Sequence, residues 1–176
     1  DPSANPEGIF VTEGARRRMK LSNKITASLD AIPYAPIALF LRVVAAHPFF
    51  ASGQTKIEGP TIGGDVFGAD VTVQIPMAVR DATFALFAEE YKLPFISPSV
   101  AAYMATALEV VLPVLLLLGL LTRLSALGLL AMTLIIQIFV YPDAWWTAHA
   151  YWAALLIVII ARGPGAISLD HLLSRR

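Results

Sequence analysis

The sequence predicts an all-α membrane protein, a bundle of four transmembrane helices with a small outward (periplasmic) cap between the first two. Of its 176 residues 57% are hydrophobic, and the mean hydropathy of +0.68 is too high for an ordinary soluble domain. Four separate apolar runs are each close to the roughly 20 residues that cross the hydrocarbon core. The stretch between the first two runs is instead rich in turn residues.

These patterns divide the chain into tails, membrane helices and a cap. We expect a cytoplasmic N-terminal tail at 1–30, membrane helices at 31–50, 99–121, 124–141 and 144–162, a cap at 51–98, and a cytoplasmic C-terminal tail at 163–176. Within the first tail, residues 1–14 are polar and lack periodicity, which predicts a flexible segment. The basic cluster Arg16–Lys20 that follows is typical of a segment retained in the cytoplasm.

The first membrane helix carries prolines where they are tolerated and one charge where it is costly. Pro33 and Pro36 fall in its opening turns, where a missing N–H group matters little. Arg42 lies about ten residues in, near the expected midplane of the bilayer. Pro48 is expected to bend or end this helix.

The predicted cap combines a hairpin with an amphipathic helix. Gly59-Pro60 and Gly63-Gly64 are turn signals, and the alternation at residues 71–75 is typical of a strand that forms half of a short β-hairpin. Pro76 then opens an amphipathic helix over residues 77–92.

Lysine and arginine residues indicate the orientation of the four helices. The two tails and the turn between the second and third helices carry Arg16, Arg17, Arg18, Lys20, Lys24, Arg123, Arg162, Arg175 and Arg176. The cap carries Lys56, Arg80 and Lys92, which are outnumbered by acidic residues. By the positive-inside rule both termini are therefore cytoplasmic and the cap faces outward.

Arg42 and Glu109 are the charged residues expected deepest in the membrane. Counted from the opposite ends of antiparallel helices, both fall at about the same depth, so they are expected to form a buried pair. Pro113 removes the N–H that would bond the Glu109 carbonyl, which leaves a free acceptor at that level. The pair is interpreted either as a structural clasp or as a site for a proton or a quinone head group.

Four further polar residues are expected near the outer ends of the helices. His47, Lys56, Gln137 and His149 could converge at the outer mouth of the bundle. Two histidines on facing helices suit haem or copper, but no HxxxH or Met–His cluster supports a metal site. They are otherwise interfacial hydrogen-bonding groups or part of a polar pocket beneath the cap.

Several classes of function have no support in the sequence. A net charge of zero gives no electrostatic basis for binding nucleic acid. The absence of cysteine excludes iron–sulfur clusters, thiolate zinc sites and dithiol exchange by this chain. Neither a phosphate-binding glycine loop, a dinucleotide fingerprint nor a nucleophile–histidine–acid set is present, so no catalytic residue and no metal ligand is assigned.

An ordered set of short motifs over residues 35–172 resembles the DoxX family of small four-helix membrane proteins. The set comprises Arg42, Ser52–Lys56, Leu108-Glu109, Leu118–Arg123 and Gly163–Asp170. The segment 86–106 is similar to a bacterial branch found beside copper- and gold-responsive peptide-buffer genes. The insert at 57–80 departs from the shorter members and suggests an added outward binding surface.

The resemblance implies a bacterial inner-membrane protein of a redox system. It suggests an accessory subunit that docks on a larger redox or energy-converting complex through its helices and cap. A second hypothesis is a quinone-interacting oxidoreductase component, and a third is a transporter of a small molecule or metal. Membrane lipid and a larger membrane complex are the expected partners. No cofactor is assigned, and a quinone or a bound lipid is the ligand that the protein could hold.

Overall fold

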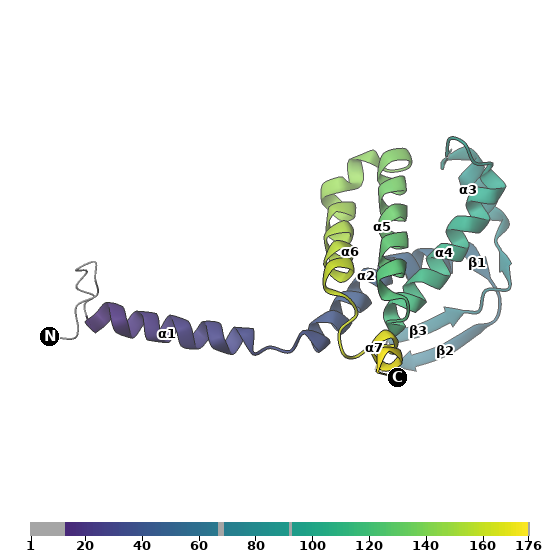
Figure 1. Cartoon of the computed structure of the whole chain (residues 1–176). Coiled ribbons are helices and arrows are strands. Elements are labelled where there is room, and N and C mark those ends of the chain that lie inside the picture. The colour runs from purple at the N-terminus through teal and green to yellow at the C-terminus, as the bar shows by residue number, and fades with distance from the viewer. Residues whose placement is uncertain (1–12, 67–68, 92, 176) are drawn as a thin grey trace. The chain divides into compact units, whose positions relative to one another are not determined.

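The computed structural model describes residues 13–66, 69–91 and 93–175 (Figure 1). It separates into two units, residues 1–33 and 34–176. The first unit contains helix α1 (Glu13–Asp30), which the sequence pattern did not predict. The expected flexible segment at 1–14 falls almost entirely on residues 1–12, which lie outside the described residues.

The predicted fold class is confirmed, because the chain is mostly helical with four helices long and apolar enough to cross a membrane. Three of them are α2 (Tyr34–Lys56), α4 (Pro98–Leu118) and α5 (Thr122–Phe139). The fourth spans Pro142–Arg162. It consists of a 3₁₀ turn, η1 (Pro142–Ala144), a π-helical turn, η2 (Trp145–His149), and α6 (Ala150–Arg162).

Helix α2 is longer than the apolar run that predicts it. It continues through Pro48 and ends at Lys56 rather than at residue 50. One missing N–H removes a single helical hydrogen bond, and the polar residues after Pro48 extend the helix because they find local partners. Thr55 Oγ1, for example, donates to Ser52 O at 2.7 Å. Lys56 therefore belongs to the helix and not to the cap.

Helix α2 packs mainly against α4, and its buried residues include the small residues Ala45, Ala46 and Gly53. Small side chains let two membrane helices approach closely, which is the usual basis of helix packing in lipid. The approach is tightest at Gly53, where an added Cβ would lie 3.0 Å from the carbonyl carbon and oxygen of Glu109. Pro113 leaves this same carbonyl without its helical donor, so the exposed backbone of α4 faces the bare backbone of α2.

The apolar core lies where α2, α4, α5 and α6 meet. Its fully buried residues include Ala45, Ala46, Phe49, Leu116, Ala126, Leu129, Leu156 and Ile159. Helices α4 and α5 are joined by a tight turn that begins at Gly119, whose φ of 70° is accessible to glycine without strain.

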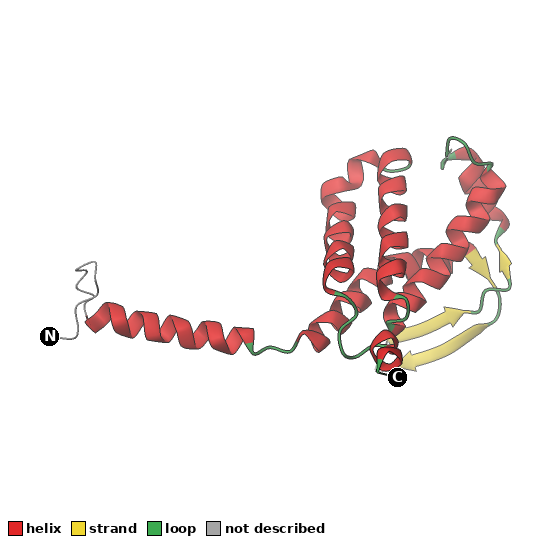
Figure 2. Ribbon diagram, in the orientation of Figure 1, coloured by secondary structure: helices red, strands yellow, loops and turns green. Residues whose placement is uncertain are grey.

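The cap consists of two small sheets and one short helix (Figure 2). Strand β1 (Ile57–Glu58) pairs with β4 (Ala78–Val79), and β2 (Thr61–Val66) pairs with β3 (Ala69–Gln74), both antiparallel. Helix α3 (Asp81–Glu89) begins five residues after Pro76, because residues 78–79 pair with β1 instead of opening the helix.

Hydrogen bonds fasten the cap to the end of α2. The side chain of Gln54 exchanges two bonds with the backbone of Gln74, at 2.7 and 3.5 Å. The carbonyl of Lys56 accepts from the Arg80 backbone N–H and from the Thr83 hydroxyl. Helix α3 then packs on the start of α4 through Phe87. The cap is therefore rigidly connected to the helix that carries Lys56.

The C-terminal segment ends in a short helix, α7 (Leu169–Ser174), which Ser168 caps by accepting from the His171 N–H. Figure 1 shows α7 at the end of the bundle where α4 meets α5, and α3 toward the opposite end. The amide of Asp170 donates to the carbonyl of Gly119 at 2.8 Å. This contact joins the C-terminal segment to the α4–α5 turn.

Candidate functional site

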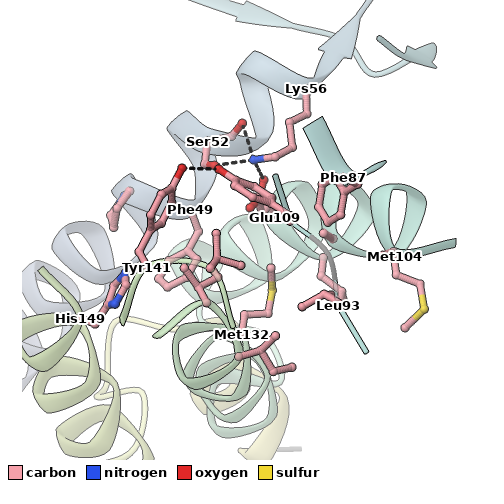
Figure 3. Close-up of a pocket in the computed structure, with 18 of the residues that line it drawn as sticks. Phe49, Ser52, Lys56, Phe87, Leu93, Met104, Glu109, Met132, Tyr141 and His149 are labelled. Atoms are coloured by element: carbon pink, nitrogen blue, oxygen red, sulfur yellow. Dashed lines mark hydrogen bonds and ion pairs between the residues drawn. The ribbon is translucent and has the colours of Figure 1, made fainter. Parts of the chain in front are cut away.

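The main candidate site is a pocket of about 220 Å³ enclosed by α2, α3, α4, α5 and the start of the fourth membrane helix (Figure 3). Most of its lining is apolar and includes Phe49, Phe87, Leu93, Met104, Ala105, Leu108, Met132, Ile135, Ile136 and Trp152. Its polar groups are Ser52, Lys56, Tyr91, Glu109, Tyr141 and His149. An apolar cavity with a few converging polar groups is the usual form of a small-molecule site.

A buried ion pair forms one wall of this pocket. Lys56 Nζ lies 2.6 Å from Glu109 Oε2, and the two side chains are only 8% and 6% exposed. Lys56 Nζ also donates to the hydroxyl of Ser52 at 2.6 Å. Figure 3 shows the three side chains meeting between α2 and α4. Each charge is costly alone in a membrane helix, and the pairing offsets much of that cost.

The local structure of α2 explains how the pair forms. Ser52 and Lys56 are four residues apart, so they lie on the same face of the helix. Gly53 lies between them and brings the α4 backbone close at Glu109. The motif Ser52–Lys56 thus contributes the Ser52 hydroxyl, the glycine that contacts the α4 backbone, and the lysine that pairs with Glu109.

A second polar group is formed by His149 and Gln137. His149 Nδ1 lies 2.7 Å from Gln137 Oε1, and Gln137 Nε2 donates to the carbonyl of Pro142 at 2.6 Å. Because an amide oxygen only accepts, this arrangement assigns the proton to Nδ1 and leaves Nε2 of the neutral ring as an acceptor. His149 is buried and lines the pocket. Gln137 is not one of the lining residues and orients the imidazole ring through its hydrogen bond.

Two tyrosines link the cap side of the pocket to the end of α5. The hydroxyls of Tyr91 and Tyr141 lie 2.8 Å apart, and their rings meet edge to face at 5.7 Å. Burial raises the pKa of Tyr91, and the hydrogen bond to Tyr141 raises it further. The phenol of Tyr91 is therefore protonated at neutral pH and remains a hydrogen-bonding group.

Arg42 and Glu109 do not form the expected pair. Arg42 donates to the backbone carbonyls of Leu117, at 3.2 Å, and Ile167, while Glu109 pairs with Lys56. The depth comparison assumed that the first helix ends at residue 50, but α2 reaches Lys56 and meets Glu109 at Gly53. Eleven residues separate Gly53 from Arg42, which is roughly 16 Å along a helix. Arg42 is therefore a clasp between α2, the end of α4 and the C-terminal segment.

Asp170 completes this clasp. Its carboxylate accepts from the backbone N–H groups of Leu121 and Thr122 and from the Thr122 hydroxyl, at 2.7 to 2.9 Å. Burial alone would raise the pKa of Asp170, but the bonds from Thr122 and Leu121, together with the charge of Arg42, outweigh it and lower the pKa. The motifs Leu118–Arg123 and Gly163–Asp170 thus meet at one end of the bundle.

Of the four residues predicted to form the outer pocket, two line the cavity and two do not. Lys56 and His149 both line the cavity, and Gln137 contacts His149. His47 is exposed on α2 and is not part of the lining. Ser52, Tyr91 and Tyr141 were missed as pocket residues; only Ser52 had a sequence signal, its spacing of four residues from Lys56.

Among the residues searched, those of the described ranges, no group of three or more histidine, aspartate or glutamate side chains could hold a metal ion. A search of curated proteins and a search of solved structures each found no significant match.

A family model does match the chain. The model for DoxX aligns with residues 37–142, which include α2 from its first turn, the cap, α4 and α5. The match covers more than half of the sequence and includes Arg42 of the clasp and the segment Ser52–Lys56 with Glu109, which form the ion pair. The chain is therefore a multi-pass membrane protein that belongs to the DoxX family.

Proposed function

We propose that the protein is a membrane component of a redox system and holds a quinone head group in the pocket beside Lys56 and Glu109. The observation that carries the proposal is the buried ion pair at the wall of an otherwise mostly apolar cavity. The DoxX family is often linked to redox-related functions, which is consistent with this ligand.

The chemistry of the pocket matches a neutral ring that bears oxygen atoms. Lys56 and Glu109 together contribute an ammonium donor and a carboxylate acceptor with no net charge, so the pair does not favour a charged ligand. A quinone oxygen can accept from Lys56, and a quinol hydroxyl can donate to Glu109 or to His149 Nε2. Phe49, Phe87 and Trp152 provide apolar surface for the ring faces.

We further propose that the protein lies in a bacterial inner membrane with both termini in the cytoplasm. The contacts of Asp170 with the α4–α5 turn support a common side for the basic residues Arg123, Arg162 and Arg175. Positive charge concentrates on the cytoplasmic side of membrane proteins. The cap and the tyrosine pair then belong to the outer side.

Quinone binding by the purified protein tests the proposed function. We expect a decyl-substituted benzoquinone to bind the wild type saturably, and Glu109→Gln to weaken binding about tenfold. The amide keeps the shape and a bond to Lys56 but removes the charge that polarises the ammonium group. Titration in detergent, followed by the quenching of tryptophan fluorescence, measures both affinities.

His47→Gln is the matched control, because His47 lies on the same helix as Lys56 but outside the pocket. It should bind like the wild type. Absence of saturable binding by the wild type, or equal affinity of Glu109→Gln and wild type, would contradict the proposal.

An exposed apolar surface on the cap favours a second function, that of an accessory subunit docked on a larger complex. Ile62 and Val73 lie opposite each other in the β2–β3 ribbon, and Val73 and Ile75 are two residues apart and so lie on one face. They are 63%, 36% and 40% exposed, and Met77 beyond them is 76% exposed. An exposed apolar surface of this kind suits contact with a partner protein.

Purification from native membranes in mild detergent tests this docking. We expect the wild type to migrate with additional chains and Ile62→Asp to lose them, because a carboxylate on the ribbon face cannot be desolvated at low cost. Thr72→Asp adds the same charge at an exposed polar position of the ribbon and serves as the control. Migration of the wild type only as a free 19.0 kDa chain or its homo-oligomer would refute the docking.

A further inference from the structure

The pocket opens sideways between α4 and α5. Met104 and Leu108 of α4 and Ile135 of α5 line the cavity and are 50%, 37% and 43% exposed. Lining residues that are exposed to this extent mark a place where the cavity reaches the exterior. These three residues belong to membrane-spanning segments, so the exterior at this place is lipid rather than water.

Contact between the two helices near their connecting turn explains the opening. At Gly128 of α5 an added Cβ would lie 2.7 Å from a methyl carbon of Leu112 on α4, so the helices are in close contact there. One helical turn farther from the connection, Leu108 and Met132 already line the pocket. Figure 1 shows α4 inclined to α5 rather than parallel to it. The helices therefore diverge beyond Gly128, and the lateral opening at Met104, Leu108 and Ile135, here called the slot, lies where they diverge.

The volume of the pocket limits what can fit inside. A cavity of about 220 Å³ is smaller than the roughly 300–1,000 Å³ of sites that enclose a drug-sized ligand. It accommodates a single substituted ring but not a long chain. The long apolar substituent of a larger ligand must therefore remain outside the pocket. The slot between α4 and α5 leads to the lipid bilayer, in which such a substituent is soluble.

Two further lining residues, Ile96 and Tyr141, are also exposed, at 40% and 48%, so the pocket has a second opening on the cap side, which differs from the first in its polar groups. Helix α2 closes one side with the buried residues Phe49 and Lys56, and His149 closes another. At the ends of α3 and α5 the hydrogen-bonded pair of Tyr91 and Tyr141 lies across the rim. The polar groups thus lie deep or at the rim, whereas the slot is lined by aliphatic side chains alone.

We infer that the ligand is a lipid-borne amphiphile, a single ring with hydrogen-bonding oxygens and a long aliphatic tail, which reaches the pocket from the bilayer between α4 and α5. The ring contacts Lys56 and Glu109, and the tail passes Met104, Leu108 and Ile135 into the lipid. The inference rests on the proposed function for the nature of the ring and adds the tail and the route.

Two probes with the same ring test this inference. One is 2,3-dimethoxy-5-methyl-1,4-benzoquinone without a tail, and the other carries a decyl chain on the ring. We expect the wild type to bind the decyl compound at least tenfold more tightly than the bare ring, in titrations corrected for partition into detergent. Ile135→Trp narrows the lateral opening and should weaken binding of the decyl compound about tenfold more than it weakens binding of the bare ring.

Leu134→Trp is the matched control, since Leu134 is the neighbouring residue on α5, is 42% exposed and does not line the pocket. It should bind both compounds like the wild type, which also reports that a new tryptophan on α5 is tolerated. Equal affinity of the wild type for both compounds, or equal weakening of both by Ile135→Trp, overturns the lateral route alone. Binding of neither compound overturns the proposed function and this inference together.

Discussion

Replacing Glu109 by alanine should lower the free energy of unfolding by about 3 kcal/mol, the typical cost of removing one member of a buried ion pair. The substitution leaves the Lys56 ammonium group buried in the wall of a mostly apolar pocket, with Ser52 as its remaining side-chain partner. Thermal or denaturant unfolding in detergent micelles measures the difference.

A double-mutant cycle separates the lost interaction from the cavity that alanine creates. Lys56→Met with Glu109→Ala should recover much of the stability lost by Glu109→Ala, because no unpaired charge then remains buried. Glu58→Ala removes an exposed carboxylate from the same region and should change stability little. Additive effects of the two single substitutions would show that Lys56 and Glu109 do not interact.

Valine in place of Gly53 should also destabilise the protein severely, by about 3 kcal/mol, at the upper end of the usual range for overpacking. Its Cβ would lie 3.0 Å from the backbone of Glu109, and a backbone cannot move aside as a flexible side chain can. Helices α2 and α4 must separate, which also lengthens the contact between Lys56 and Glu109. We therefore expect lower thermal stability and weaker quinone binding in the same variant.

Gly64→Val is the control for this substitution. Gly64 lies in strand β2 with an ordinary φ, and an added Cβ would meet nothing within 4 Å. Its stability and binding should equal those of the wild type. Equal stability of Gly53→Val and Gly64→Val would contradict the close contact of α2 and α4 at Gly53.

The sequence predicted the membrane architecture because hydrophobic length is a property of the chain itself. The apolar runs around Glu109 and Leu129 each span the bilayer whatever their neighbours are, so their helices could be assigned without a structure. The end of α2 could not be assigned in this way. Ser52, Gln54 and Lys56 look like the start of a polar loop. Their continuation of the helix depends on the local bonds to Ser52 and on the contacts of Lys56 with Glu109 and of Gln54 with Gln74.

The candidate site was predictable in part for the same reason. Lys56, Gln137 and His149 lie at helix ends that had to meet if four helices form one bundle, and the structure brings Lys56 and His149 to one cavity. The partner of Glu109 depends on which residue of α2 crosses α4, and no periodicity encodes a crossing point. The contact of Tyr91 with Tyr141 joins residues 50 positions apart and has no local signal either.

The central claim is that the Lys56–Glu109 pair forms the polar wall of a site for a lipid-borne ring. A structure of the full chain, determined by cryo-electron microscopy or crystallography with the decyl-substituted benzoquinone bound, tests it most directly. The account predicts density for the ring within hydrogen-bonding distance of Lys56 or Glu109, and density for the tail between α4 and α5. Ring density elsewhere on the protein, with this pocket filled by rearranged side chains, would contradict it.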